Sequence, residues 1–236
     1  MQATAPLARY QMTFEDGGAA TLNIPSHPSG EPPDWARLEH CQCRNCPLHA
    51  AQSPFCPFAL ALVTPLHELA GRQSFDQVHV CIDWNGRHLE QSSTLQRVLS
   101  SVIGLVGATS GCPHTRLLSP MAHFHQPFSG AAETLFRALG TYLMGQLLRQ
   151  QNGLSARYDL EGLMEIYRAL REVNLGMAER LRSATRAEQG INGIVLLDVL
   201  AAEALEYMES PQSSFGELFA AYLSDDVAEP DQDSTG

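Results

Sequence analysis

The sequence contains no lysine. All 15 basic residues are arginine and they face 26 acidic residues, so the formal net charge is −11. Such a chain repels a phosphate backbone, and we therefore expect no nucleic-acid partner. Long apolar runs are also missing. The most apolar stretch, 191–205, is interrupted by Asn192, Asp198 and Glu203, so we expect no membrane-spanning helix.

Targeting and catalytic motifs are missing as well. The first 18 residues lack the basic segment followed by an apolar segment that is typical of a secretory signal, so we expect a cytoplasmic location. The sequence has no H-E-x-x-H, no G-x-S-x-G, no Walker loop and no dinucleotide-binding fingerprint. No reaction can be inferred, and whether the protein is an enzyme is left open.

Two segments have the pattern of β-hairpins. Apolar and polar residues alternate in 8–14 and 19–24 around the turn E-D-G-G, and two further strands flank Asn85-Gly86. Because isolated hairpins are barely stable, we expect residues 8–25 and 77–92 to form one antiparallel sheet.

From residue 94 onward the apolar residues recur at helical spacing, and a short helix with a kink or break at Pro65 is expected at 59–70. The predicted fold is α+β: a small antiparallel sheet of two hairpins, with a cysteine-rich metal loop, packed on a mainly helical C-terminal bundle. We divide the chain into a β-rich region with the cysteine cluster (1–92), a helical region (93–223) and an acidic tail expected to be disordered (224–236).

The six cysteines favour metal or redox chemistry over disulfides in a reducing cytosol. Four of them form C-x-C-x2-C-x9-C between 41 and 56, and a C-x2-C turn can bring two thiolates to one cation. The preferred metal ligands are Cys43, Cys46, Cys56 and Cys112, with Cys41 or His114 as alternates; Cys81 is assigned to packing. We expect Zn²⁺, with an iron–sulfur cluster as the alternative, because four thiolates suit both.

The segment S-G-C-P-H at 110–114 places a thiol where a helix is expected to begin, which lowers a thiol pKa and suits a metal ligand or a nucleophile. Cys112 and His114 are therefore also the catalytic candidates. His123 and His125 are two residues apart and cannot easily share a metal; we expect buried, hydrogen-bonded histidines and leave ligation open. Asp198, within an apolar run, is expected to pair with a buried arginine or histidine.

Several motifs resemble those of an uncharacterised bacterial family, a domain of unknown function. The similar segments are C-R-N-C-P-L (43–48), C-P-F-A-L (56–60), T-L-Q-R-V-L-S-S (94–101), S-G-C-P-H through P-M-A-H-F-H-Q-P-F (110–128), Y-R-A-L-R-E-V-N (167–174) and I-N-G-I-V-L-L-D (191–198). The resemblance implies no activity.

Two classes of function remain. The first is an intracellular metal-binding protein with a structural site, most simply zinc, and a regulatory or protein-interaction role with a protein partner or a second copy of the chain. The second is a thiol- or metal-dependent enzyme or redox protein using Cys112 and His114, or an iron–sulfur protein. A closed four-cysteine site favours the first class, because a catalytic zinc keeps an open coordination position.

Overall fold

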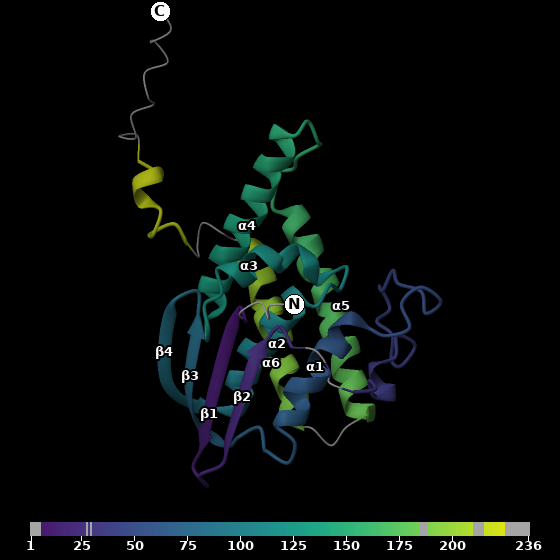
Figure 1. Cartoon of the computed structure of the whole chain (residues 1–236). Helices are drawn as coiled ribbons and strands as arrows, with labels where there is room; N and C mark the ends of the chain where they lie inside the picture. Colours follow the sequence, from purple (N-terminus) through teal and green to yellow (C-terminus); the bar gives the residue numbers. More distant parts are fainter. Residues whose placement is uncertain (1–5, 27, 29, 185–187, 210–214, 225–236) are drawn as a thin grey trace, which may run out of the picture.

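Helices and strands follow one another in the order expected from the sequence (Figure 1). The computed structural model describes residues 6–26, 28, 30–184, 188–209 and 215–224. The elements are β1 (Ala8–Phe14), β2 (Ala19–Ile24), η1 (Asp34–Ala36), α1 (Pro57–Glu68), β3 (Gln77–Trp84), β4 (Arg87–Thr94), α2 (Leu95–Thr109), η2 (Thr115–Leu118), α3 (Ser119–His123), α4 (Ala131–Gln151), α5 (Glu161–Ala184), α6 (Glu188–Glu209) and η3 (Ala220–Tyr222). The α+β prediction is confirmed. The expected tail lies, except for Ser224, outside the described residues.

The two hairpins form one antiparallel sheet in the order β2-β1-β3-β4. Tyr10 on β1 faces Leu22 on one neighbouring strand and Ile82 on the other. Alternate residues of β1 and β3 are buried, as their alternating pattern predicts. The opposite face of β3 and β4 is mostly exposed and polar.

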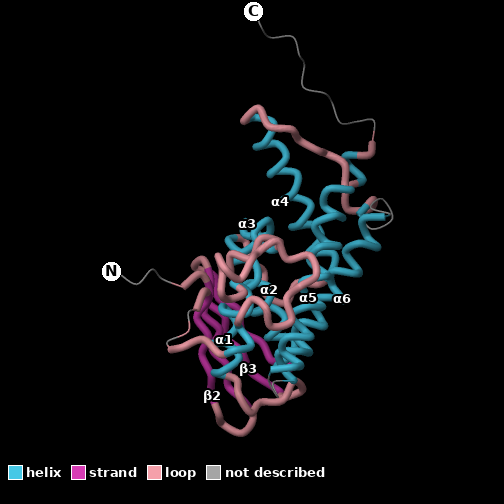
Figure 2. Tube along the Cα trace, turned by 90° about the vertical axis from the view of Figure 1, so that its right-hand side faces the viewer, coloured by secondary structure: helices cyan, strands magenta, loops and turns pink. Residues whose placement is uncertain are grey.

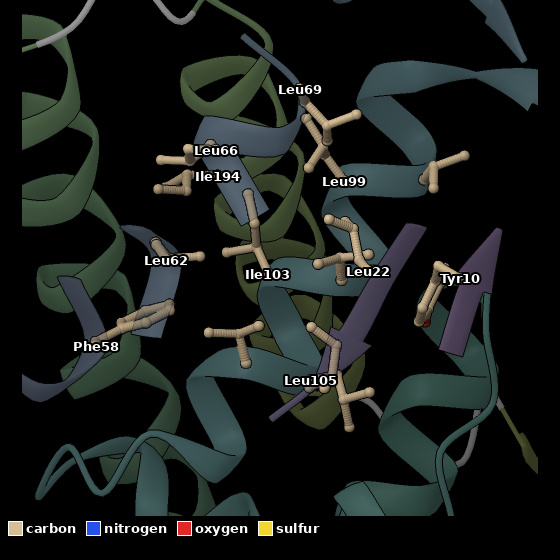
Figure 3. Packing of buried hydrophobic residues seen from close by; sticks show 14 of the residues in the cluster. Tyr10, Leu22, Phe58, Leu62, Leu66, Leu69, Leu99, Ile103, Leu105 and Ile194 are labelled. Atoms are coloured by element: carbon tan, nitrogen blue, oxygen red, sulfur yellow. The ribbon is translucent and has the colours of Figure 1, made fainter. Parts of the chain in front are cut away.

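Helix α2 is the centre of the main core. It contacts the sheet on one side and α1 and α6 on others. Figure 3 shows Leu99 and Ile103 of this helix close to Leu66 of α1 and Ile194 of α6. Helix α6 comes so close that a Cβ added at Gly193 would lie 3.0 Å from the Ile103 side chain. A larger residue at position 193 would therefore push the two helices apart.

A second, smaller core lies where α4, the first half of α5 and the end of α6 meet. Its buried residues are Leu135, Ala138, Tyr142, Leu163, Tyr167, Leu170, Ala201, Ala204 and Met208. Figures 1 and 2 show α4 and the start of α5 extending beyond the rest of the fold. No helix among the described residues is long and apolar enough to cross a membrane.

Helix α1 differs from the prediction at both ends. It begins at Pro57, directly after the N-cap residue Cys56, and it continues through Pro65 to Glu68. Of the expected kink or break at Pro65, the break is wrong, because α1 is one continuous helix through this residue. The proline lies in the last turn, where it disturbs few hydrogen bonds, and Leu62 and Leu66 on either side of it are anchored in the core.

Asp198 forms an ion pair, but with a partly exposed partner. Both oxygens of its carboxylate accept hydrogen bonds from Arg171, at 3.2 Å each. The Arg171 side chain is 41% exposed, so the expected buried partner is wrong. We predict that Asp198→Ala lowers the free energy of unfolding by about 1 kcal/mol or less, because solvent screens such pairs. Urea unfolding measures this change, and a loss above about 2 kcal/mol would contradict it.

Candidate metal centre

A buried arginine holds the cysteine-bearing loop against α5. Arg180 is 1% exposed and donates to the carbonyl oxygens of Trp35 (2.6 Å), Arg37 (2.5 Å) and Leu38 (3.2 Å). Figure 1 shows this loop lying beside the C-terminal half of α5. The guanidinium therefore fixes the path of the chain just before the first cysteines.

The C-R-N-C turn rests on the same helix. The Cys46 amide donates to the Cys43 carbonyl oxygen at 3.0 Å, which closes the turn. The Asn45 side chain donates to the carbonyl oxygen of Ala169 on α5 at 3.0 Å. A Cβ added at Gly176 would lie 2.7 Å from the Cys43 sulfur, so only glycine allows this approach.

Cys56 lies at the other end of the loop, as the N-cap residue of α1. Its side chain is buried, and its backbone amide donates to the Ala36 carbonyl oxygen at 2.8 Å. Burial raises the pKa of this thiol, while the amides of Ala59 and Phe58 and the charge of Arg180 lower it. Burial outweighs the helix start and the arginine, so the pKa of the Cys56 thiol is raised overall.

The segment that carries Cys112 is joined directly to the C-R-N-C turn. His114 donates from Nε2 to the carbonyl oxygen of Asn45 at 2.7 Å, across 69 residues of sequence. Because a carbonyl oxygen only accepts, Nε2 carries the proton. Cys112 itself is 8% exposed and belongs to the same core cluster as Cys56, against which Cys46 packs. The 3-10 helix η2 begins at Thr115 with His114 as its N-cap, whereas the expected first helical residue was Pro113 with Cys112 or Ser110 as the cap; the expected cap is therefore wrong.

The four preferred cysteines influence one another electrostatically. The pKa of the Cys43 thiol is raised to about 12, first by burial and then by the charges of Cys56, Cys46 and Cys112, whereas Arg180 acts in the opposite direction. The four thiols thus occupy one neighbourhood beside a buried cation. All six cysteines are free of disulfides.

The spacing of these sulfur atoms is wider than in a closed zinc site. Zn–S bonds of about 2.3 Å in a tetrahedron place sulfur atoms about 3.8 Å apart. Among the described residues, only His79, Cys81 and Glu90 form a group of three or more His, Cys, Asp or Glu ligand atoms within 4.8 Å of one another. No three of the four thiols meet that distance.

Cys41 lies apart from this neighbourhood. Its sulfur is 3.5 Å from the hydroxyl oxygen of Ser183, which also bonds to His40 at 2.8 Å. Ser183 follows Gly176, the neighbour of Cys43, by seven residues, or about 10 Å along a helix. The structure therefore does not bring Cys41 to the turn that holds Cys43.

Of three further residues, His125 lies as expected, whereas His123 and Cys81 do not. His125 is buried, and its Nε2 bonds to the hydroxyl groups of Tyr10 (2.7 Å) and Ser101 (3.4 Å), as expected of a core histidine. His123 is exposed, so its expected burial is wrong. Cys81 is not a core residue, since it lies half-buried on the polar face of the sheet.

Sequence reasoning missed Arg180. The residue follows Gly176 by four positions and therefore lies on the same face of α5 as the contact with Cys43. An arginine between the apolar positions Met177 and Leu181 of the helix stripe was the available signal.

These features describe an α+β protein in which a cysteine-rich loop, the start of α1 and the Cys112 segment bring four half-buried or buried thiols into one neighbourhood. The chain belongs to the family described as Domain of unknown function (DUF6901), whose model matches residues 8–220. Searches of curated proteins and of solved structures found no match.

Proposed function

We propose that this is a metal-binding protein whose centre is held by Cys43, Cys46, Cys56 and Cys112. The observation that carries the proposal is the 2.7 Å hydrogen bond from His114 to Asn45, which joins the Cys112 segment to the C-R-N-C turn. A metal here would link the loop, α1 and the start of the helical region, and its binding free energy would add to the stability of the fold.

The charges around the thiols fit a metal–thiolate centre. Four thiolates around a divalent cation leave a net charge of about −2, which is costly to bury without a counter-charge. Arg180 supplies one buried positive charge, and its Nε has no hydrogen-bond partner among the described residues. A negatively charged sulfur is a suitable acceptor for such a donor.

Zinc requires the four sulfur atoms to move closer together than they lie here, whereas an iron–sulfur cluster is larger than one ion and holds its thiolates further apart. The wide spacing therefore favours an iron–sulfur cluster as the second candidate. The enzyme alternative has less support. Cys112 is 8% exposed and His114 uses its Nε2 proton on Asn45, whereas a nucleophile needs access and a base within hydrogen-bond reach.

We predict that serine at any of the four positions lowers the metal content by at least half, because each thiolate is one of four ligands. Zinc, iron and acid-labile sulfide are measured on the protein purified under reducing, oxygen-free conditions. Zinc alone indicates a single ion, and iron with equal sulfide indicates a cluster. Cys41→Ser is the matched control and should keep the wild-type content, because the Cys41 sulfur lies beside Ser183 and apart from the four thiols.

Of the four proposed ligands, Cys112 is the most distant in sequence, since it lies 56 positions after Cys56. The proposal fails if Cys112→Ser keeps the full metal content at unchanged affinity while native Cys112 is rapidly alkylated. Cys112 would then be a free, activated thiol, and the enzyme alternative would be preferred.

A further inference from the structure

A cavity of about 500 Å³ lies between α2, the bend at 115–130 and helices α4, α5 and α6. Its volume is typical of sites that bind small molecules. Most of its wall is apolar; the apolar residues include Leu118, Met121, Leu170, Leu197 and Leu200. Phe58 and Thr115, which follow Cys56 and Cys112 by two and three residues, form part of the same wall. The cavity therefore adjoins the cysteine cluster without including any of its thiols.

An arginine without a counter-ion lines this cavity. Arg137 on α4 has no carboxylate of the described residues within 4.0 Å, and its Nε is buried without a hydrogen-bond partner. Its one hydrogen bond among the described residues is long, from Nη1 to the Phe124 carbonyl oxygen at 3.3 Å. Burial lowers the pKa of this guanidinium, while Tyr167 and Glu133 act in the opposite direction. A half-buried cation in such surroundings is costly until an anion joins it.

The other charged and polar groups around the cavity leave this positive charge uncompensated. Arg97 also lines it, against one acidic residue, Glu203, and both are exposed. His125 adds no charge at neutral pH, because burial, and secondarily Arg137, lowers its pKa to about 4. Neutral groups such as Asn174 and Thr134 complete the polar part of the wall. In a chain of net charge −11, this is a local site for a negative group.

We propose that the cavity binds a small amphipathic carboxylate, with the carboxylate group at Arg137 and the apolar body among the leucines of α2, α5 and α6. An arginine binds a carboxylate through two parallel hydrogen bonds. Burying the apolar part of the ligand against the apolar wall makes the binding free energy more favourable. A neutral ligand of the same shape would bury the same apolar area but leave the guanidinium unpaired.

The test uses decanoate, decanol and decylamine as probes, with binding measured by calorimetry on the full chain with its native metal content. Decanoate should bind saturably and at least about tenfold more tightly than decanol, since a hydrogen bond to a charged group contributes enough binding free energy for a tenfold difference in affinity. Decylamine should bind most weakly. Equal affinity for decanoate and decanol, or no saturable decanoate binding, overturns the proposal.

Two variants separate the charge from the cavity. Arg137→Gln should lower the decanoate affinity about tenfold and leave decanol unchanged, whereas Arg149→Gln on the exposed part of α4 should change neither. Leu200→Trp fills the cavity and should abolish the binding of both probes even if Arg137→Gln fails to fold. Unchanged decanoate binding in Arg137→Gln or in Leu200→Trp would contradict the assignment. The metal content of each variant is measured in parallel, so that a failure of the carboxylate proposal can be distinguished from a failure of the proposed metal centre.

Discussion

Arg180→Ala is expected to lower the free energy of unfolding by about 3 kcal/mol or more, because three backbone carbonyl oxygens, buried or partly buried, lose their donor at once. The side chain is 1% exposed, so its removal also leaves a cavity between α5 and the loop at 35–38. The lost hydrogen bonds and the cavity both weaken the contact between α5 and the loop at 35–38. We therefore expect the cysteine-bearing loop to detach from α5 before the sheet unfolds.

The measurement is urea unfolding of the wild type and of Arg180→Ala, each with its metal content determined first. Arg182→Ala is the matched control: the residue is exposed two positions further along the same helix, and its loss should change stability by no more than about 0.5 kcal/mol. Metal content should fall in Arg180→Ala alone, since the arginine also lowers the pKa of Cys43 and Cys56. Similar stability of the two variants would show that the loop is held by other contacts.

The sheet was predictable because its determinants are local. Alternation along 8–14 and 78–84 assigns one face of each strand to the core, and Asn85-Gly86 has the positive φ angles that this turn requires. Helix α2 was predictable from its apolar stripe for the same reason. No local sequence pattern, however, predicts that α6 packs against α2 at Gly193, because this contact forms only when the two folded helices meet.

The candidate site was predictable only in part. Cysteine density, the C-x2-C turn and the S-G-C-P-H segment selected four residues, and these do lie in one neighbourhood, but the ligand set stays a prediction. Arg180 and Arg137 were missed because each is an arginine in a helix, and an isolated helix does not reveal which arginine a distant segment will bury. His123 and His125 show the same limit: their opposite burial depends on which side of the bend faces Tyr10.

Gly176→Val is expected to lower the free energy of unfolding by about 3 kcal/mol and, if the proposed centre binds a metal, to lower the metal content by more than half. The added Cβ would lie 2.7 Å from the Cys43 sulfur and 3.2 Å from its Cα, so the contact is with backbone as well as side chain. A backbone contact cannot be relieved by a change of rotamer, and the C-R-N-C turn must move away from α5. Cys43 would then leave the other three thiols.

Gly145→Val on α4 is the matched control, because nothing lies within 4 Å of a Cβ added there. Both changes replace a helical glycine by the same residue, so helix propensity alters by a similar, small amount in each, and their difference reports the contact with Cys43. Urea unfolding and metal analysis of both variants measure the two effects separately. If Gly176→Val loses stability but keeps its metal at wild-type affinity, the turn moves without disturbing the centre, and Cys43 is not one of its ligands. If it loses both together while Gly145→Val loses neither, the close approach of the loop to α5 is what brings the Cys43 thiolate to the metal.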